Sequence, residues 1–137
     1  MTAQQYTGEA VSLLSHLIAT PSVSRDERRA ADIMEEELTR CGFTPHREAN
    51  NVWAIGPCQR EDRPTLLLNA HIDTVKPVAS YTRNPYEPSL EDGTLYGLGS
   101  NDCGGGLVSL LQVFRELSAS ERCPYNLVYL ASAEEEV

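Results

Sequence analysis

Three short polar segments contain the residues best suited to chemistry. His71 and Asp73 follow one apolar run, Asp102 lies in the glycine-rich segment 97–106, and three consecutive glutamates, 134–136, follow a second apolar run. Imidazole nitrogen and carboxylate oxygen are ligands that zinc favours, and a carboxylate can also transfer protons. Together the three segments predict a metal site with an adjacent general base.

Each segment alone has a less specific interpretation. A His-x-Asp sequence after a strand is often a local hydrogen bond or surface polarity. Asp102 stands near a predicted helix start, where aspartate is a common N-cap, and three glutamates usually form a solvated acidic patch. The metal interpretation depends on all three occurring together, two of them directly after strands.

The spacing also suits the chemistry. Asp73, two residues beyond His71 in an extended segment, points to the same side and can orient the imidazole. The two oxygens of Asp102 can bridge two cations, and the small residues around it allow close packing of the backbone: Gly99, Gly104, Gly105 and Gly106. Of two adjacent glutamates, one can bind metal while the other remains free as a base.

Three helices are expected to support these segments. The first covers about 5–19 and ends at Thr20-Pro21, because a residue before proline avoids the helical region. Ser24 is predicted to cap the second helix, with Glu27 as its capping-box partner, and Gly42 to end it. The third begins near Asn101 or Asp102, with Leu107, Leu110, Leu111, Phe114 and Leu117 on its inner face.

Strands are expected at about 43–47, 51–55, 65–70 and 126–131, with a turn at Asn50-Asn51. The run 65–70 is continuously apolar, which indicates a strand covered on both faces. Residues 77–99 form a long, turn-rich connection that includes the tight turn Asp92-Gly93. This order predicts an α/β fold with a mixed, mainly parallel sheet flanked by helices, and ligands at the carboxyl ends of its strands.

Composition restricts the partners. A net charge of −9 and a pI of about 4.7 argue against nucleic acid and anionic membrane surfaces. The four cysteines have no paired spacing, which is typical of reduced thiols, and the first residues lack a signal-peptide pattern. We therefore expect a cytoplasmic protein that acts on a small molecule.

The segments "HIDTV", "NPYEPSLEDGTLYGLGSND" and "SAEEEV", in this order, resemble the dinuclear zinc deacylases and exopeptidases. That family includes acetylornithine deacetylase, succinyl-diaminopimelate desuccinylase, aminoacylase and glutamate carboxypeptidase. The resemblance implies that His71 binds one zinc, that Asp73 orients the imidazole of His71, and that Asp102 bridges both ions. It further implies that Glu135 is the general base and Glu136 a ligand of the second zinc; Glu134 receives no role.

By this resemblance the reaction is hydrolysis of the amide bond of an N-acyl amino acid, as in acetylornithine deacetylase and arginine biosynthesis. Glu135 would take a proton from the attacking water and return it to the departing amine. Two zinc ions are expected, and cobalt or manganese suits the same ligands. Where the family has a Met/Thr-Lys-Gly-Gly-like run, this chain has Cys103 and three glycines. We interpret Cys103 as a buried substitute, with a soft ligand or an oxidation site as alternatives.

The resemblance also implies that residues 1–137 are the N-terminal portion of a catalytic domain. A further carboxylate and a histidine ligand, and a lid domain that often supplies a homodimer interface, would lie beyond Val137. Neither His16 nor His46 is expected to replace them. We do not expect the 137 residues alone to be an active enzyme. Two other hypotheses remain, a metallo-exopeptidase acting on short peptides and an inactive fragment of such an enzyme.

Overall fold

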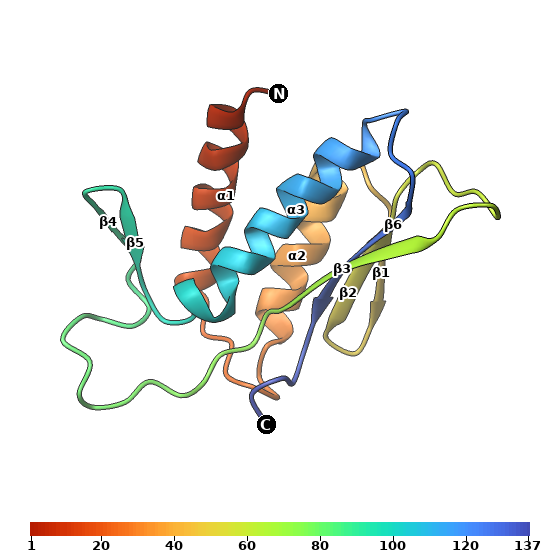
Figure 1. The fold of residues 1–137 in the computed structure, drawn as a ribbon. Helices are drawn as coiled ribbons and strands as arrows, with labels where there is room; N and C mark the ends of the chain where they lie inside the picture. The colour runs from red at the N-terminus through yellow and green to blue at the C-terminus, as the bar shows by residue number, and fades with distance from the viewer.

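The computed structural model describes all 137 residues, and its helices pack against one face of a β-sheet (Figure 1). The regular elements, in chain order, are α1 (Ala3–Ile18), α2 (Arg28–Arg40), β1 (Pro45–Glu48), β2 (Asn51–Ile55), β3 (Thr65–His71), β4 (Ser89–Glu91), β5 (Thr94–Tyr96), α3 (Gly105–Ser118) and β6 (Asn126–Ser132). None of the helices has both the length and the apolar character needed to span a bilayer.

The main sheet has the strand order β1-β2-β6-β3. β2 pairs antiparallel with β1 and β6, whereas β3 and β6 are parallel, in a register that places His71 beside Ser132. The α/β class and the mixed sheet are therefore confirmed, with parallel pairing confined to β3 and β6. Because these two strands run in the same direction, their carboxyl ends meet at one edge of the sheet.

The core lies between one face of the sheet and the helices. The strands contribute alternate residues to it, and α2 and α3 pack over them: Val52, Ala54, Leu127, Tyr129, Ala131, Met34, Leu38, Leu111 and Phe114 are all buried. The hydroxyl of Tyr129 donates to the carbonyl of Leu107 at 3.0 Å, which satisfies its one polar group within this core. α1 packs against α3 on the side away from the sheet (Figure 1).

The opposite face of the sheet is open. Leu67 on β3 is 53% exposed and Ile55 on β2 is 45% exposed, so the expectation that 65–70 is covered on both faces is wrong for this chain. The reason is that helices cover only one face of the sheet: Leu66, Leu68 and Ala70 face them, and Leu67 lies on the other face. A continuous apolar run does not distinguish one covered face from two.

Two predicted element boundaries are also wrong. α2 begins at Arg28 with Glu27 in the capping position, where Glu27 makes no side-chain capping bond, and the Ser24 hydroxyl donates to Asp73 instead. α3 begins at Gly105, because Asp102 and Cys103 have non-helical backbone angles. The turn between β1 and β2 is formed one residue earlier than predicted, at Ala49-Asn50.

The long connection after β3 contains a small hairpin. β4 and β5 pair antiparallel around Asp92-Gly93, the predicted tight turn, where both residues have positive φ. The hairpin lies apart from the main sheet and is joined to it by extended segments (Figure 1). The segment after it returns the chain to the carboxyl end of β3, where Leu98 N donates to Pro85 O at 2.8 Å.

Gly104 is a position where packing requires glycine. A Cβ there would lie 2.6 Å from Leu14 Cδ1 and 2.7 Å from the carbonyl oxygen of Gly99. We expect Gly104→Ala to lower the free energy of unfolding by about 1–3 kcal/mol, measured by urea denaturation. Gly106→Ala is the matched control, because nothing lies within 4 Å of its Cβ and α3 should gain about 0.5–1 kcal/mol. Equal effects of the two changes would contradict this packing argument.

Candidate metal centre

His71 is the last residue of β3 and is buried at the edge where β3 and β6 end. Its backbone N–H donates to the sulfur of Cys103 at 3.2 Å, and Ile72 N donates to Ser132 O at 2.8 Å. The bond from Ile72 continues the β3–β6 ladder beyond the last residue of β3, and the bond from His71 ties it to the segment before α3. The position of the His71 ring is thus determined by the sheet, not by a mobile loop.

The two nitrogens of the His71 ring face different groups. Nδ1 lies 2.8 Å from the carbonyl oxygen of Asp73 and 3.5 Å from its carboxylate Oδ1. Nε2 lies 3.1 Å from Asp102 Oδ1 and 3.9 Å from Glu135 Oε2. A proton on Nδ1 has acceptors on the Asp73 side, which leaves the Nε2 lone pair directed toward the carboxylates.

Asp73 is a buried carboxylate with several donors. Its Oδ2 accepts a hydrogen bond from the Ser24 hydroxyl and another from the backbone N–H of Glu136 at 2.9 Å. Burial raises the pKa of Asp73, but the hydrogen bonds from Ser24 and from the amides of Glu136 and Glu135 outweigh it, so the pKa is lowered. Asp73 is therefore held as a carboxylate beside the imidazole.

Asp102 lies in a tight turn that precedes α3. Gly99 has φ 74°, in the left-handed region, and Gly104 N donates to Gly99 O at 2.8 Å to close the turn. The peptide bond between Asp102 and Cys103 is cis. The Asp102 side chain is 75% exposed, so one oxygen contacts His71 while the carboxylate remains open to solvent.

Glu135 and Glu136 follow β6 through an abrupt change of backbone direction. Glu134 has φ 59°, which is unusual for a residue with a side chain, and it brings the amide of Glu136 to Asp73. His71, Glu135 and Glu136 have ligand atoms that all lie within 4.8 Å of one another, and so do His71, Asp102 and Cys103. His71 belongs to both groups.

The structure thus brings together all five residues that the sequence singles out: His71, Asp73, Asp102, Glu135 and Glu136. Cys103 is half-buried, and its thiol contacts the backbone of His71. Burial, with the nearby charges of Asp102 and Glu135, raises the pKa of Cys103 despite the hydrogen bond from His71 N–H. His16 lies on α1, and His46 stacks on Trp53, so neither joins the group.

Two contributors to this arrangement were missed by the sequence reasoning. Ser24 was assigned to a helix cap, and Glu134 was given no role. A capping-box pattern does not reveal that a serine hydroxyl will bond to a residue 49 positions later. The left-handed backbone of Glu134 has no signal at all in a run of three identical residues.

A cavity of about 480 Å³ opens beside the candidate ligands. Asp102 and Glu136 line it, together with Tyr81, Arg83 and Tyr96. The Arg83 guanidinium lies 3.9 Å from the Tyr96 ring centroid and donates two hydrogen bonds to Glu91. These bonds, with a further one from Ser89, lower the pKa of Glu91 to about 2. The cavity has the size of a small-molecule site.

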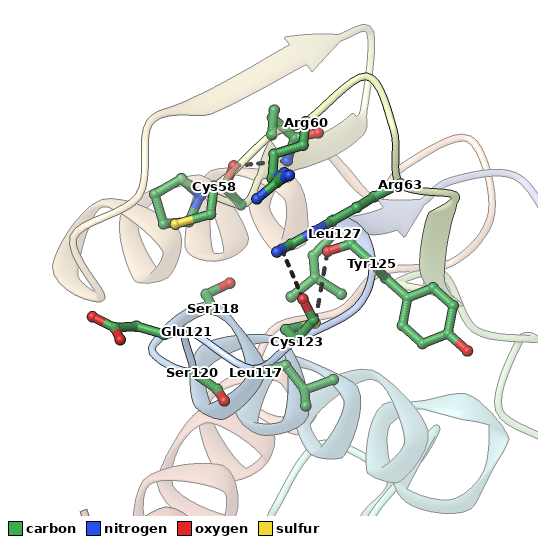
Figure 2. Close-up of a pocket in the computed structure, with 13 residues that line it drawn as sticks. Cys58, Arg60, Arg63, Leu117, Ser118, Ser120, Glu121, Cys123, Tyr125 and Leu127 are labelled. Atoms are coloured by element: carbon green, nitrogen blue, oxygen red, sulfur yellow. Dashed lines mark hydrogen bonds between the residues drawn. The ribbon is translucent and has the colours of Figure 1, made fainter.

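A second hollow, of about 220 Å³, lies at the opposite end of the sheet (Figure 2). Figure 2 shows Arg60 and Arg63 above it, with Arg63 donating to the carbonyl of Cys123 at 2.8 Å. Cys58 and Cys123 both line it, and both are free cysteines. It contains none of the predicted site residues.

The electrostatics of His71 lead to a pH prediction. Burial alone would lower the pKa of His71, but hydrogen bonds to Asp73 and Asp102 and the charges of Asp73 and Glu135 raise it above its ordinary value of about 6.5. A raised folded-state pKa means that protonated His71 stabilises the fold below the unfolded pKa, and that this stabilisation is lost as the pH rises through the folded pKa.

We therefore expect the free energy of unfolding of the metal-free chain to fall, relative to His71→Gln, between about pH 6 and pH 8. Urea denaturation of both chelator-treated proteins at several pH values measures this difference. A difference that stays constant, or that grows as the pH rises, would contradict the predicted direction of the pKa shift.

Comparison with known proteins supports the interpretation of this site. The family model described as Peptidase family M20/M25/M40 matches residues 67–137, which is more than half of the chain and includes all three polar segments. Similar curated proteins include succinyl-diaminopimelate desuccinylases. That of Xylella fastidiosa (strain M23) is 29% identical over 135 residues, with 93% of this chain and 35% of the relative covered. That of Caulobacter sp. (strain K31) is 30% identical, with 93% and 33% covered.

Similar solved structures agree on the fold. An M20 family metallo-carboxypeptidase from Sulfolobus solfataricus superimposes with a TM-score of 0.78 at 23% identity, covering 99% of this chain and 32% of that one. The di-peptidase Dug1p from Saccharomyces cerevisiae gives 0.75 at 22%, covering 97% and 33%. A Bacillus subtilis protein described as a dinuclear metal binding peptidase gives 0.70 at 18%, covering 99% and 37%.

The chain spans about a third of the length of the curated relatives it matches. Over that third, three observations indicate the same family: the order of the polar segments, the fold and the match to the family model. The chain belongs to the peptidase family M20/M25/M40.

Proposed function

We propose that this chain supplies part of a dinuclear metal centre in an enzyme that hydrolyses the amide bond of an N-acyl amino acid. The observation that carries the proposal is the position of His71, whose ring belongs to two groups of possible ligands, each with its ligand atoms within 4.8 Å of one another. One imidazole shared by a pair of carboxylates (Glu135 and Glu136) and by a carboxylate with a thiol (Asp102 and Cys103) is an arrangement suited to binding cations.

The residues fit two divalent ions. His71 would bind one ion through Nε2, Asp102 would bridge both, and Glu136 would bind the other. Nitrogen and oxygen donors of this kind suit zinc, and cobalt and manganese are compatible with them. The exposed carboxylate of Asp102 has a second oxygen free for bridging. Bound ions would polarise the scissile carbonyl and lower the pKa of the attacking water.

Glu135 is proposed as the general base. Its carboxylate is 61% exposed and lies beside the His71 ring, with Oε2 3.9 Å from Nε2. From there it would accept a proton from the attacking water and transfer it to the nitrogen of the departing amine. Asp73 would keep His71 in the tautomer that leaves Nε2 free. The products would be a carboxylate and a free amino acid.

For the substrate we propose an N-acyl amino acid of the acetylornithine type, in a cytoplasmic biosynthetic pathway such as that of arginine. The desuccinylase relatives, whose name denotes removal of an acyl group, support this class. A second candidate is a short peptide, supported by the carboxypeptidase and di-peptidase neighbours. The cavity beside Asp102 and Glu136 admits either substrate. The full-length form, meaning a protein of the relatives' length that contains this chain, is proposed to be a homodimer.

A panel of substrates separates these two candidates. N-acetylornithine, N-succinyl-diaminopimelate and unblocked dipeptides would each be incubated with the zinc-loaded full-length form, and the released amines quantified. Preference for the acylated amino acids would support the deacylase proposal. Preference for the dipeptides would replace it with the exopeptidase.

Metal binding by the chain is directly measurable. We expect calorimetric titration of zinc into the metal-free protein to give binding that His71→Gln abolishes, because both ligand groups share His71. The affinity should be modest, since the exposed carboxylates are ordered by few contacts. His46→Gln is a suitable control, because that ring stacks on Trp53 outside the site. Equal affinity in the wild type and His71→Gln would refute the proposed centre.

The adjacent glutamates should respond differently to the same change. Glu136→Gln removes a ligand and should weaken zinc binding, whereas Glu135→Gln should leave it within about twofold and reduce kcat of the full-length form by about 10²–10⁴-fold. Calorimetry and turnover assays on both variants test this assignment. If Glu135→Gln retained full turnover, it could not be the base.

A further inference from the structure

We propose that Ser24 is a positioning residue of this centre, acting through the carboxylate of Asp73 on both His71 and Glu136. Its link to a metal rests on the function proposed above, but the arrangement of the three side chains does not. Ser24 lies on the segment between α1 and α2, remote in sequence from every predicted ligand.

The Asp73 carboxylate is the point at which three segments meet. Its Oδ2 accepts from the Ser24 hydroxyl and from the backbone N–H of Glu136. Its Oδ1 is buried, accepts no hydrogen bond, and lies 3.5 Å from His71 Nδ1. With Oδ2 occupied by two donors, the carboxylate has one orientation, in which Oδ1 faces the imidazole.

The Ser24 hydroxyl is held in place by its own backbone. Thr74 N donates to Ser22 O at 2.9 Å and Ser24 N to Thr74 O at 3.3 Å, which joins this segment to the residues after Asp73. Val23 and Thr74 form a parallel bridge between those two bonds. Arg25 then has φ 74°, a left-handed conformation that is strained for a residue with a side chain and persists only where the surroundings impose it.

The consequence for His71 concerns which ring nitrogen carries the proton. A fixed Asp73 offers its carbonyl oxygen to Nδ1–H at 2.8 Å and holds the negative charge of Oδ1 3.5 Å from the same nitrogen. That favours the tautomer with the proton on Nδ1 and a free lone pair on Nε2. Without the Ser24 hydroxyl, the carboxylate can rotate, and Oδ2 keeps only the Glu136 amide.

The consequence for Glu136 is positional. Its backbone N–H donates to the same oxygen that Ser24 occupies, so Ser24 and Asp73 together determine where the chain runs after β6. One serine hydroxyl therefore influences a ligand at the end of β3 and a ligand at the end of β6. Residues that orient metal ligands in this way typically change metal affinity by about 10–100-fold when removed.

The first test uses the metal-free chain and needs no ligand. Two-bond ¹H–¹⁵N correlation spectra of the histidine rings report the tautomer of His71 in the wild type, Ser24→Ala, Ser24→Thr and a control. Ser15→Ala is the matched control, because that partly buried hydroxyl donates within α1 to Val11 O at 2.8 Å. At a pH above the pKa of His71 in the folded chain, where the ring is neutral, we expect the Nδ1–H form in the wild type and control, a mixture in Ser24→Ala, and recovery in Ser24→Thr.

The second test is zinc affinity measured by calorimetry. Ser24→Ala should weaken binding by about tenfold, and Ser24→Thr should restore most of it. In an Asp73→Ala background, Ser24→Ala should cause no further loss, because Ser24 acts only through Asp73. Additive losses would mean that Ser24 acts on the fold as a whole, and thermal unfolding of each variant would register that effect.

The outcomes separate the two proposals. If the wild type binds no zinc but Ser24→Ala shifts the His71 tautomer, the metal centre fails and the positioning role of Ser24 stands. If the wild type binds zinc and Ser24→Ala matches Ser15→Ala in both tautomer and affinity, the positioning role is overturned while the metal centre stands.

Discussion

The parallel pairing of β3 with β6 is the constraint on which the candidate site depends. The register that places His71 beside Ser132 brings two segments 61 residues apart in sequence to the same edge of the sheet. Parallel neighbours cannot be joined by a tight turn, so the chain between them must form a crossover, and α3 provides it. The turn that begins α3 carries Asp102, which arrives at this edge because the crossover has to start there. The positions of His71, Asp102 and the glutamates after β6 thus follow from one pair of strands.

A buried carboxylate connects these segments. Removing Asp73 from water is costly unless donors compensate, and the Ser24 hydroxyl and the Glu136 amide supply that compensation. The cost makes the arrangement specific, because a rotated carboxylate would lose the two donors that Oδ2 now has. The nearby core residues Ala70, Ile72 and Ala131 are buried, so little water is available to replace the donors to Asp73. Rigidity at His71 therefore comes from a polar network supported by the apolar core.

How much of this could be predicted from the sequence differs between local and long-range features. Periodicity located the three helices and the strands of the main sheet, and residue types indicated the polar segments, because apolar runs and ligand chemistry are both local. The hairpin of β4 and β5 was predicted only as a turn, and the choice of Glu135 and Glu136 over Glu134 came from the family resemblance. The capping role given to Ser24 was wrong, since the competing acceptor is Asp73, and no local pattern encodes that contact. The start of α3 was placed too early for a similar reason. Asp102 resembles an N-cap in sequence, but in the turn that follows Gly99 its backbone has an extended conformation. The exposure of Leu67 depends on which face of the sheet the helices cover, and only the tertiary arrangement reveals that.

The charges at this edge also explain why the site should favour cations. Asp73, Asp102, Glu135 and Glu136 surround one imidazole, in a chain whose net charge is −9. Carboxylates this close repel one another, and the raised pKa of His71 is the response that the protein itself can make, by holding a proton among them. A proton offers one positive charge at one point, whereas a divalent ion offers two and accepts several oxygens at once. Binding a metal would therefore replace the proton on Nε2 and reduce the repulsion among the four carboxylates. Because that repulsion also destabilises the fold, it links metal affinity to the stability of the edge where β3 and β6 end.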